Sequence, residues 1–272
     1  MSGVMDRTLG ILELLAHHGD GLELGDLSQR LNIPRSGAHR LLVDLVAAGY
    51  VRQLREHGAY TLTTKLVSIG LIFLSRSGIV DIAQPLLNKL AEISGELARL
   101  SVVDGERLTW VARAQGARQG LRYDPDMGSD ARLSCSSSGW AWLSTLSDDV
   151  GMAVVARQGL GLRADFGPQA PQTLAEVHAA IRHARALGYA LSVDTYTAGL
   201  SAISVPVRLA GQPALGVLTI AGPTVRFTLE RMQSLAPELM DFAAQLAAAS
   251  GGSPFFNQGA SAGGERKPLY AD

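Results

Sequence analysis

The chain has 272 residues, of which 47% are hydrophobic and 18% are charged, and its formal net charge is −1. This length favours two compact units that each bury a core, and the composition excludes wholesale disorder. The near-neutral charge excludes a strongly basic field, so any contact with nucleic acid must use a local patch.

The sequence shows no pattern of secretion or of a membrane span. The single cysteine, Cys135, cannot form an intramolecular disulfide, which fits a reducing compartment. Asp6 and Glu13 interrupt the N-terminal segment, so it does not read as a signal peptide. The longest apolar run near the middle, 66–74, is far shorter than the roughly 20 residues that a membrane-spanning helix needs. We therefore expect a soluble, cytoplasmic protein without membrane contacts.

The N-terminal part of the chain predicts three helices, a hairpin and a connecting helix. Apolar residues recur at helical spacing, and glycine or asparagine follows each of the first three helices. Pro34 suits the first turn of the third helix because its missing N–H would have no partner there. The predicted helices are 4–18, 24–31, 35–48 and 65–77, and the hairpin strands are 50–54 and 59–62.

The remainder of the chain predicts an α+β unit. Its strands fall into hairpins, one of them turned by Asp104-Gly105, which favours a mainly antiparallel sheet with helices packed on it. The predicted strands are 99–103, 108–114, 189–193, 202–209 and 214–220. The predicted helices are 81–94, 138–146, 148–157, 174–187 and 228–249. From residue 250 onward Gly, Ser and Pro replace the apolar periodicity, so we expect a disordered tail.

The second and third predicted helices, joined by a short turn, form a helix-turn-helix. This motif places the N-terminal part of its second helix in the major groove of double-stranded DNA. The candidate base-reading residues are therefore Arg35, Ser36, Gly37, His39 and Arg40. Arginine pairs with guanine or phosphate, serine bonds to either, and Gly37 allows close backbone approach. The hairpin would be a wing whose candidate phosphate contacts are Arg52, Arg55 and His57.

The charge of this region leaves an alternative open. Residues 1–62 contain no lysine, and their arginines and acidic residues are equal in number to within one. This balance gives the region little net positive charge with which to attract DNA. A helical interaction module is therefore the alternative that the residues alone permit.

A long ordered match adds a family resemblance. It comprises the segment 7–15, Arg-Thr-Leu-Gly-Ile-Leu-Glu-Leu-Leu, then 24–42, then Gly49-Tyr-Val-Arg and Tyr60-Thr-Leu. With these segments, residues 7–71 resemble the N-terminal domain of the IclR family of transcription regulators. The resemblance implies a winged helix-turn-helix whose recognition helix carries the arginines and histidine named above. Gly37 stands where the family usually has Thr or a larger residue.

Three further places in the chain, 136–143, 188–200 and the pair 202–207 with 218–223, are similar to the effector domain of that family. That domain resembles a GAF fold, and the similarity covers roughly residues 80–249. Trp140 replaces the family's usual Lys at the first place.

The resemblance also implies a ligand pocket. In family members that sense small acids, a Cys at the position of Ala202 and two Ser at those of Thr219 and Ala221 hold the ligand carboxylate. Only Thr219 keeps a hydroxyl here, which implies a larger and drier pocket that favours an aromatic or branched carboxylate. Arg122 or Arg132 would supply a bidentate donor. The candidate ligand-binding residues are Arg122, Arg132, Ser138, Gly139, Trp140, Asp194, Leu200, Ala202, Thr219 and Ala221.

We therefore expect a ligand-responsive transcriptional regulator of a catabolic operon, either a repressor or an activator. Its domains would be a winged helix-turn-helix over 1–63, a linker helix over 64–79, a GAF-like effector-binding domain over 80–249 and a disordered tail over 250–272. The resemblance implies a homodimer or homotetramer that binds an inverted-repeat operator.

No catalytic residue, metal ligand or cofactor is predicted. Cys135 has no base placed by sequence to activate it, and His178 and His183 lie five residues apart, not the four that bring two ligands onto one helix face. Two alternatives remain open. In one, the second domain only oligomerises; in the other, it is an enzyme or a small-molecule binding module.

Overall fold

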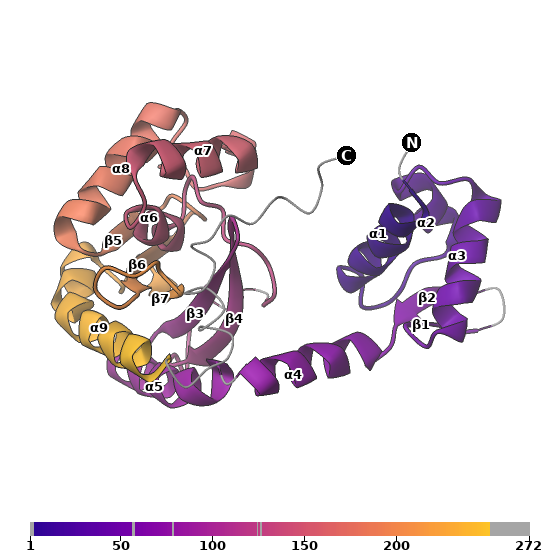
Figure 1. The fold of residues 1–272 in the computed structure, drawn as a ribbon, viewed down its shortest axis with the longest axis horizontal. Helices are drawn as coiled ribbons and strands as arrows, with labels where there is room; N and C mark the ends of the chain where they lie inside the picture. The colour runs from indigo at the N-terminus through magenta and orange to yellow at the C-terminus, as the bar shows by residue number, and fades with distance from the viewer. Residues whose placement is uncertain (1–2, 56–57, 78, 124, 126, 251–272) are drawn as a thin grey trace. The chain divides into compact units, whose positions relative to one another are not determined.

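The chain folds into two compact units, residues 1–74 and 75–272 (Figure 1). The computed structural model describes residues 3–55, 58–77, 79–123, 125 and 127–250. Each unit has its own hydrophobic core. Of the tail predicted as disordered, only Ser250 is described, where it ends the last helix; residues 251–272 lie outside the described part.

The elements as far as residue 77 are those that the sequence predicts. The helices are α1 (Val4–Ala16), α2 (Leu24–Arg30), α3 (Arg35–Ala47) and α4 (Lys65–Ser77), and the strands are β1 (Val51–Gln53) and β2 (Tyr60–Leu62). The two strands pair antiparallel, with Arg52 opposite Thr61. Ile11 of α1, Leu27 of α2 and Leu42 of α3 are fully buried, so each helix contributes its apolar stripe to one shared core.

The buried side of α3 is narrower than its apolar pattern predicts. Ala38, Leu42 and Leu45 are buried, whereas Leu41 is half-buried and Val46 is 40% exposed. The apolar positions of this helix, Ala38, Leu41, Leu42, Leu45 and Val46, predict one buried stripe. For Val46 this prediction is wrong, because successive helical residues are about 100° apart, which turns Val46 to the edge of the stripe.

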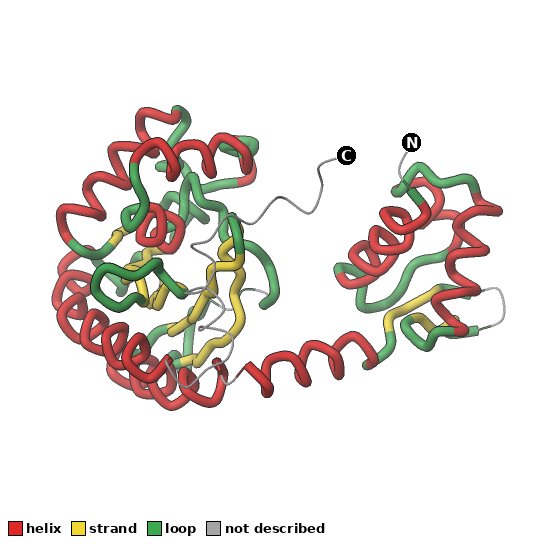
Figure 2. Tube along the Cα trace, in the orientation of Figure 1, coloured by secondary structure: helices red, strands yellow, loops and turns green. Residues whose placement is uncertain are grey.

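The C-terminal unit is an antiparallel sheet with helices on both faces (Figure 2). The strands are β3 (Leu97–Asp104), β4 (Arg107–Gln115), β5 (Ala190–Val193), β6 (Leu200–Val207) and β7 (Gly216–Pro223), in the order β4-β3-β7-β6-β5. The helices are α5 (Ile79–Ser94), α6 (Ser137–Leu143), α7 (Asp148–Gln158), α8 (Leu174–Leu187) and α9 (Leu229–Ala249), with a 3-10 turn at Arg163–Asp165. Every predicted strand and helix is present, although α6 ends three residues before its predicted end.

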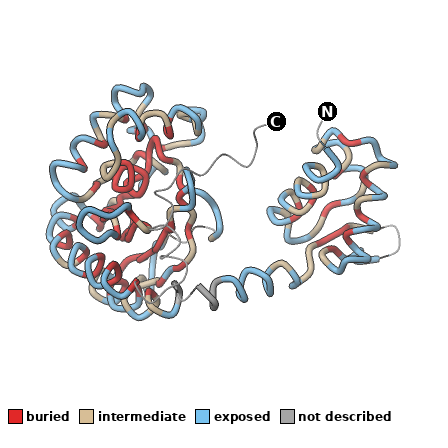
Figure 3. The backbone as a smooth tube through the Cα atoms, in the orientation of Figure 1, coloured by how far each residue is buried: buried red, intermediate tan, exposed pale blue. Residues whose placement is uncertain are grey.

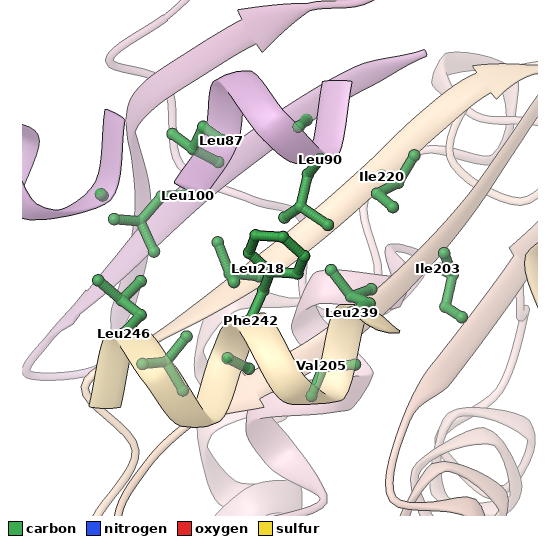
Figure 4. Close-up of a cluster of buried hydrophobic side chains, with 14 of the residues drawn as sticks. Leu87, Leu90, Leu100, Ile203, Val205, Leu218, Ile220, Leu239, Phe242 and Leu246 are labelled. Carbon is green, nitrogen blue, oxygen red and sulfur yellow. The ribbon is translucent and has the colours of Figure 1, made fainter. Parts of the chain in front are cut away.

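One face of the sheet is packed against α5 and α9. Alternate residues of each strand point to it, among them Leu100 of β3 and Leu218 of β7. Figure 4 shows both in one cluster with side chains of α5, such as Leu90, and of α9, such as Phe242. This face holds the largest cluster of buried apolar side chains in the unit.

The opposite face is covered by α6 and, beyond it, α8. All residues of α6 are buried, as the red helix in Figure 3 shows. Gly139 permits this close packing: a Cβ there would lie 2.6 Å from the Cα of Leu133. The residues of β3 and β7 that point to this second face include Arg99, Ser101 and Thr219, so it is far more polar than the first.

Candidate functional site

The exposed face of α3 carries four of the predicted base-reading residues. Arg35, Ser36, His39 and Arg40 are exposed, and Gly37 is half-buried. A Cβ on Gly37 would meet Ile33 Cγ2 at 3.5 Å, which is ordinary contact, so helix packing does not require glycine at this position.

The turn before α3 fixes how the helix is presented. Asn32 adopts a left-handed conformation with φ of 50°, which asparagine tolerates better than most residues. Ser28 Oγ donates a hydrogen bond to the carbonyl oxygen of Ile33 at 2.6 Å, and Ile33 itself is buried. The turn is therefore anchored to α2 by a side-chain bond and to the core by an apolar contact.

The hairpin that the sequence predicts as a wing is present. Arg52 and Arg55 are exposed on it, and His57 lies outside the described residues. The backbone N–H of Leu54 donates to Ala59, which closes the hairpin beyond the last paired strand residues. Arg52 thus lies within a two-stranded sheet of defined register, and Arg55 lies in the turn that follows its first strand.

A cavity lies on the polar face of the C-terminal sheet, with a free volume of about 30 Å³. Its lining residues come from all five strands, from the start of α6 and from two loops. They are Arg99, Trp110, Tyr123, Ser136, Ser137, Ser138, Ser192, Tyr196, Leu200, Ala202, Thr219 and Ala221. On the same measure a water molecule occupies about 10–15 Å³, so the cavity has room for two or three.

Strand register explains why these residues meet. Arg99 of β3 pairs with Thr219 of β7, and residues directly opposite each other point to the same face. Ala221 of β7 pairs with Ala202 of β6, which in turn pairs with Ser192 of β5. Segments more than a hundred residues apart in sequence therefore build one surface.

Arg99 is the principal charge in the cavity lining, although it is only 3% exposed. Its guanidinium carbon lies 3.7 Å from the centroid of the Trp110 ring. Burial lowers the pKa of Arg99 to about 10, and hydrogen bonding to the phenol oxygen of Tyr123 acts in the opposite direction. The pKa of Tyr123 is raised to about 12, also by burial. At neutral pH the pair is therefore a guanidinium cation and a neutral phenol.

Hydroxyl groups supply most of the remaining polar lining. Ser204 Oγ lies 2.8 Å from Ser137 Oγ and 2.8 Å from Thr219 Oγ1, so α6, β6 and β7 share a chain of three hydroxyls. Ser137 and Thr219 line the cavity. Because a hydroxyl both donates and accepts, this chain can adjust to a ligand group of either kind.

Five of the predicted ligand-binding residues are brought together at this cavity: Ser138, Leu200, Ala202, Thr219 and Ala221. Trp140 and Gly139 are not among its lining residues. The Trp140 indole N–H donates to the carbonyl oxygen of Ser134 at 3.1 Å, and the ring belongs to the core between α6 and α8. Gly139 serves the packing of α6 described above.

The other three predicted residues also lie outside the lining. Asp194 Oδ1 accepts from the backbone N–H of Gly199 at 2.6 Å, which shapes the loop after β5. Arg132 donates to the carbonyl oxygen of Gln158 at 3.2 Å, and Arg122 is exposed. The arginine at the cavity is thus a different one from the two that the sequence suggests.

The residues that sequence reasoning missed are Arg99, Trp110, Tyr123, Ser136, Ser137, Ser192 and Tyr196. Arg99 had a detectable signal, because it is the one charged residue in the otherwise apolar and small segment from Leu97 to Val103. A charge in a strand that is buried on both faces indicates a polar site. The tyrosines stand on loops and had no such signal.

Other candidate chemistry finds little support. Cys135 is buried, and burial raises the pKa of its thiol to about 11, so the thiolate nucleophile is disfavoured. Among the described residues, no group of three His, Cys, Asp or Glu side chains is placed to hold a metal ion. In the same part of the chain, no helix is long and apolar enough to cross a bilayer.

Comparisons with known proteins agree with this organisation. Residues 4–55 match the IclR helix-turn-helix domain, and residues 72–248 match the family described as bacterial transcriptional regulator IclR C-terminal. The chain is 31% identical to the HTH-type transcriptional regulator BhcR of Paracoccus denitrificans over 89% of its own length and 85% of that protein's. It is 27% identical to the acetate operon repressor of Salmonella typhimurium, over 92% and 90% of the two chains.

A solved structure shares the fold. An IclR homolog from Microbacterium hydrocarbonoxydans, crystallised in complex with 4-hydroxybenzoate, superposes with a TM-score of 0.75 at 18% identity, covering 92% of this chain and 100% of the other. The family matches, the homologues and the winged helix-turn-helix lead to one conclusion: the chain belongs to the IclR family of transcription regulators and is a DNA-binding regulator, not an enzyme.

Proposed function

We propose that a small organic acid binds in the cavity of the C-terminal unit and thereby changes the affinity of α3 and the wing for an operator. The observation that carries this proposal is Arg99, a cation that lines the cavity and is almost entirely removed from solvent. Burial of a cation is costly, and a carboxylate beside it would offset that cost through charge-assisted, bidentate hydrogen bonds.

The remaining lining favours an aromatic or branched acid. Trp110, Leu200, Ala202 and Ala221 supply apolar walls, and the hydroxyl chain that includes Thr219 supplies bonds for a second polar group. The 4-hydroxybenzoate held by the structural relative from Microbacterium hydrocarbonoxydans supports the same ligand class.

Such an acid is larger than the present free volume, so binding must enlarge the cavity. Tyr123 and Tyr196 are the lining residues best placed to move, because both stand on loops rather than on the sheet. A ligand that displaces them shifts the unit between two conformations. That shift is the means by which occupancy would reach the DNA-binding unit.

The DNA-binding species would be a homodimer or homotetramer that recognises an inverted repeat. Helix-turn-helix dimers place their recognition helices in two half-sites about one helical turn, or multiples of it, apart. In support, α4 exposes Val67, Ile69 and Leu71, each by 46% or more, and packing between copies would remove this apolar surface from water. The name of the acetate operon repressor supports a catabolic operon as the target.

The experiment is to measure binding of the purified protein to the DNA upstream of its own gene, at fixed salt, with and without a panel of aromatic and aliphatic carboxylates. Specific binding that one class of acid alters is the expected result. Specific binding that no acid alters, together with no shift in melting temperature, would instead favour a C-terminal unit that only oligomerises.

A further inference from the structure

One exposed stripe of α3 contains an apolar residue. Ser36, His39, Arg40 and Val43 follow the spacing i, i+3, i+4, i+7, which places all four on the same side of a helix. All four are exposed, and Val43 is exposed by 51%. A valine in this position gains nothing from the core of its own domain, because Leu42 and Leu45 face that core instead.

The stripe has the dimensions and charge of a DNA-reading surface. A homeodomain reads the major groove with four residues of one helix at this same spacing. Val43 lies about 10 Å along the helix axis from Ser36, at 1.5 Å per residue, and the major groove is about 12 Å wide. Arg40 in the stripe and Arg35 just before it make the N-terminal part of this face positive, which complements a polyanion, while the exposed carboxylate of Asp44 follows Val43.

Only one base presents an apolar group in the major groove, the 5-methyl group of thymine. We propose that Val43 contacts that methyl group at one thymine of each half-site and so helps to set the operator sequence. This inference rests on DNA binding through α3, and it adds a residue whose contact is apolar to the polar set predicted from sequence.

The test replaces thymine by deoxyuridine, which removes the methyl group and leaves the base-pairing edge unchanged. Operator sites are first selected from random duplexes with the full-length protein. Each thymine of one half-site is then replaced in turn, and dissociation constants are measured by fluorescence anisotropy at one salt concentration. We expect one position at which deoxyuridine weakens wild-type binding roughly fourfold, the effect of burying one methyl group.

The variant Val43→Ala should bind the thymine and deoxyuridine duplexes of that position equally. Val46→Ala is the matched control, since Val46 is exposed on the same helix but lies nearer its C-terminal end. This variant should keep the fourfold ratio between the dissociation constants of the deoxyuridine and thymine duplexes.

Two results would overturn the inference while leaving DNA binding intact: no thymine at which the methyl group matters, or an unchanged ratio in Val43→Ala. A changed oligomeric state of Val43→Ala in sedimentation, with the ratio kept, would assign Val43 to a contact between copies. If selection retains no sequence at all, DNA binding through α3 fails, and the inference fails with it.

Discussion

The guanidinium of Arg99 lies against the ring of Trp110 because a β-bulge shifts the pairing register between β3 and β4 by one residue. Leu100 pairs with Ala112, but the next residue, Ser101, pairs with Trp110, so one residue of β4 is left over. Without the bulge Trp110 would pair with Val102 and point to the face that packs against α5 and α9. The extra residue turns the indole to the cavity face, where it covers the cation.

Arg99→Met should abolish most of the carboxylate affinity. Loss of hydrogen bonds to a charged group costs about 1.5–3 kcal/mol, which corresponds to a roughly 10- to 150-fold increase in Kd measured by calorimetry. The fold should survive, since the lining of the cavity, among the described residues, contains no carboxylate that would be left as an unpaired buried charge. Arg122→Met is the control, and equal losses in both variants would contradict the assignment to Arg99.

Ala221→Ser should shift the preference of the cavity toward smaller acids. Ala221 lies directly opposite Ala202 in the sheet, so the added hydroxyl narrows the cavity and makes its wall more polar. The ratio of the dissociation constants for an aromatic acid and a two- or three-carbon acid is the quantity to measure. This ratio should rise several-fold. A general loss of stability would raise both dissociation constants alike and so leave the ratio unchanged. An unchanged ratio would show that Ala221 does not select the ligand.

Arg52→Ala in the wing should weaken binding to all DNA sequences to the same extent. A phosphate contact carries no base information, and its loss reduces the slope of log Kd against log salt by about one. Arg118→Ala, an exposed arginine of the C-terminal unit, should leave the slope as it is. If Arg52→Ala instead relaxes the sequence preference, Arg52 reads bases and the phosphate assignment is wrong.

Two Arg–Glu pairs of similar geometry should differ in their effect on stability. Arg226 holds Glu96 through two hydrogen bonds of 2.5 and 2.9 Å, and the Glu96 side chain is 5% exposed. Removing Arg226 leaves a buried carboxylate without its partner, so Arg226→Ala should cost about 3 kcal/mol in denaturant unfolding. Arg157 and Glu106 are both 55% exposed, so Arg157→Ala should cost under about 1 kcal/mol. Equal costs would contradict the role of burial.

Asp148 should make the stability of the C-terminal unit depend on acid pH. Its carboxylate accepts from His178 and from Arg185, each at 2.6 Å, and these bonds lower the pKa of Asp148. A carboxyl whose pKa is lower in the folded state stabilises above its ordinary pKa, and that contribution is lost as the pH falls through the folded value.

Asp148→Asn should therefore melt below the wild type at pH 7, and the difference in Tm should close as the pH falls below about 4. Asp149→Asn, in the same first turn of α7, is the control for effects of the helix dipole. A difference in Tm that stays constant down to pH 2 would show that the pairing of Asp148 does not contribute.

The sequence alone determined the secondary structure and the kind of protein. Periodicity of 3.6 or 2 residues located the helices and strands, because local apolar spacing decides which face of an element can be buried. The helix-turn-helix could be predicted for the same reason: its second helix and the turn at Asn32 are contiguous in the chain. His178 shows the limit of that reading, since periodicity places it on a helix but does not reveal its partner Asp148, which lies on another helix.

The tertiary structure alone decided which arginine faces the cavity. Arg122 and Arg132 are nearer in sequence to the serine segment 136–138 than Arg99 is. The pairing of β3 with β7 nevertheless places Arg99 beside Thr219, on the face of the sheet where the cavity is lined by those serines. The bulge in β4 and the loops that bring in Tyr123 and Tyr196 have no periodic signature. A site assembled across strands depends on register, and register is fixed by the packing of the whole sheet rather than by any one segment.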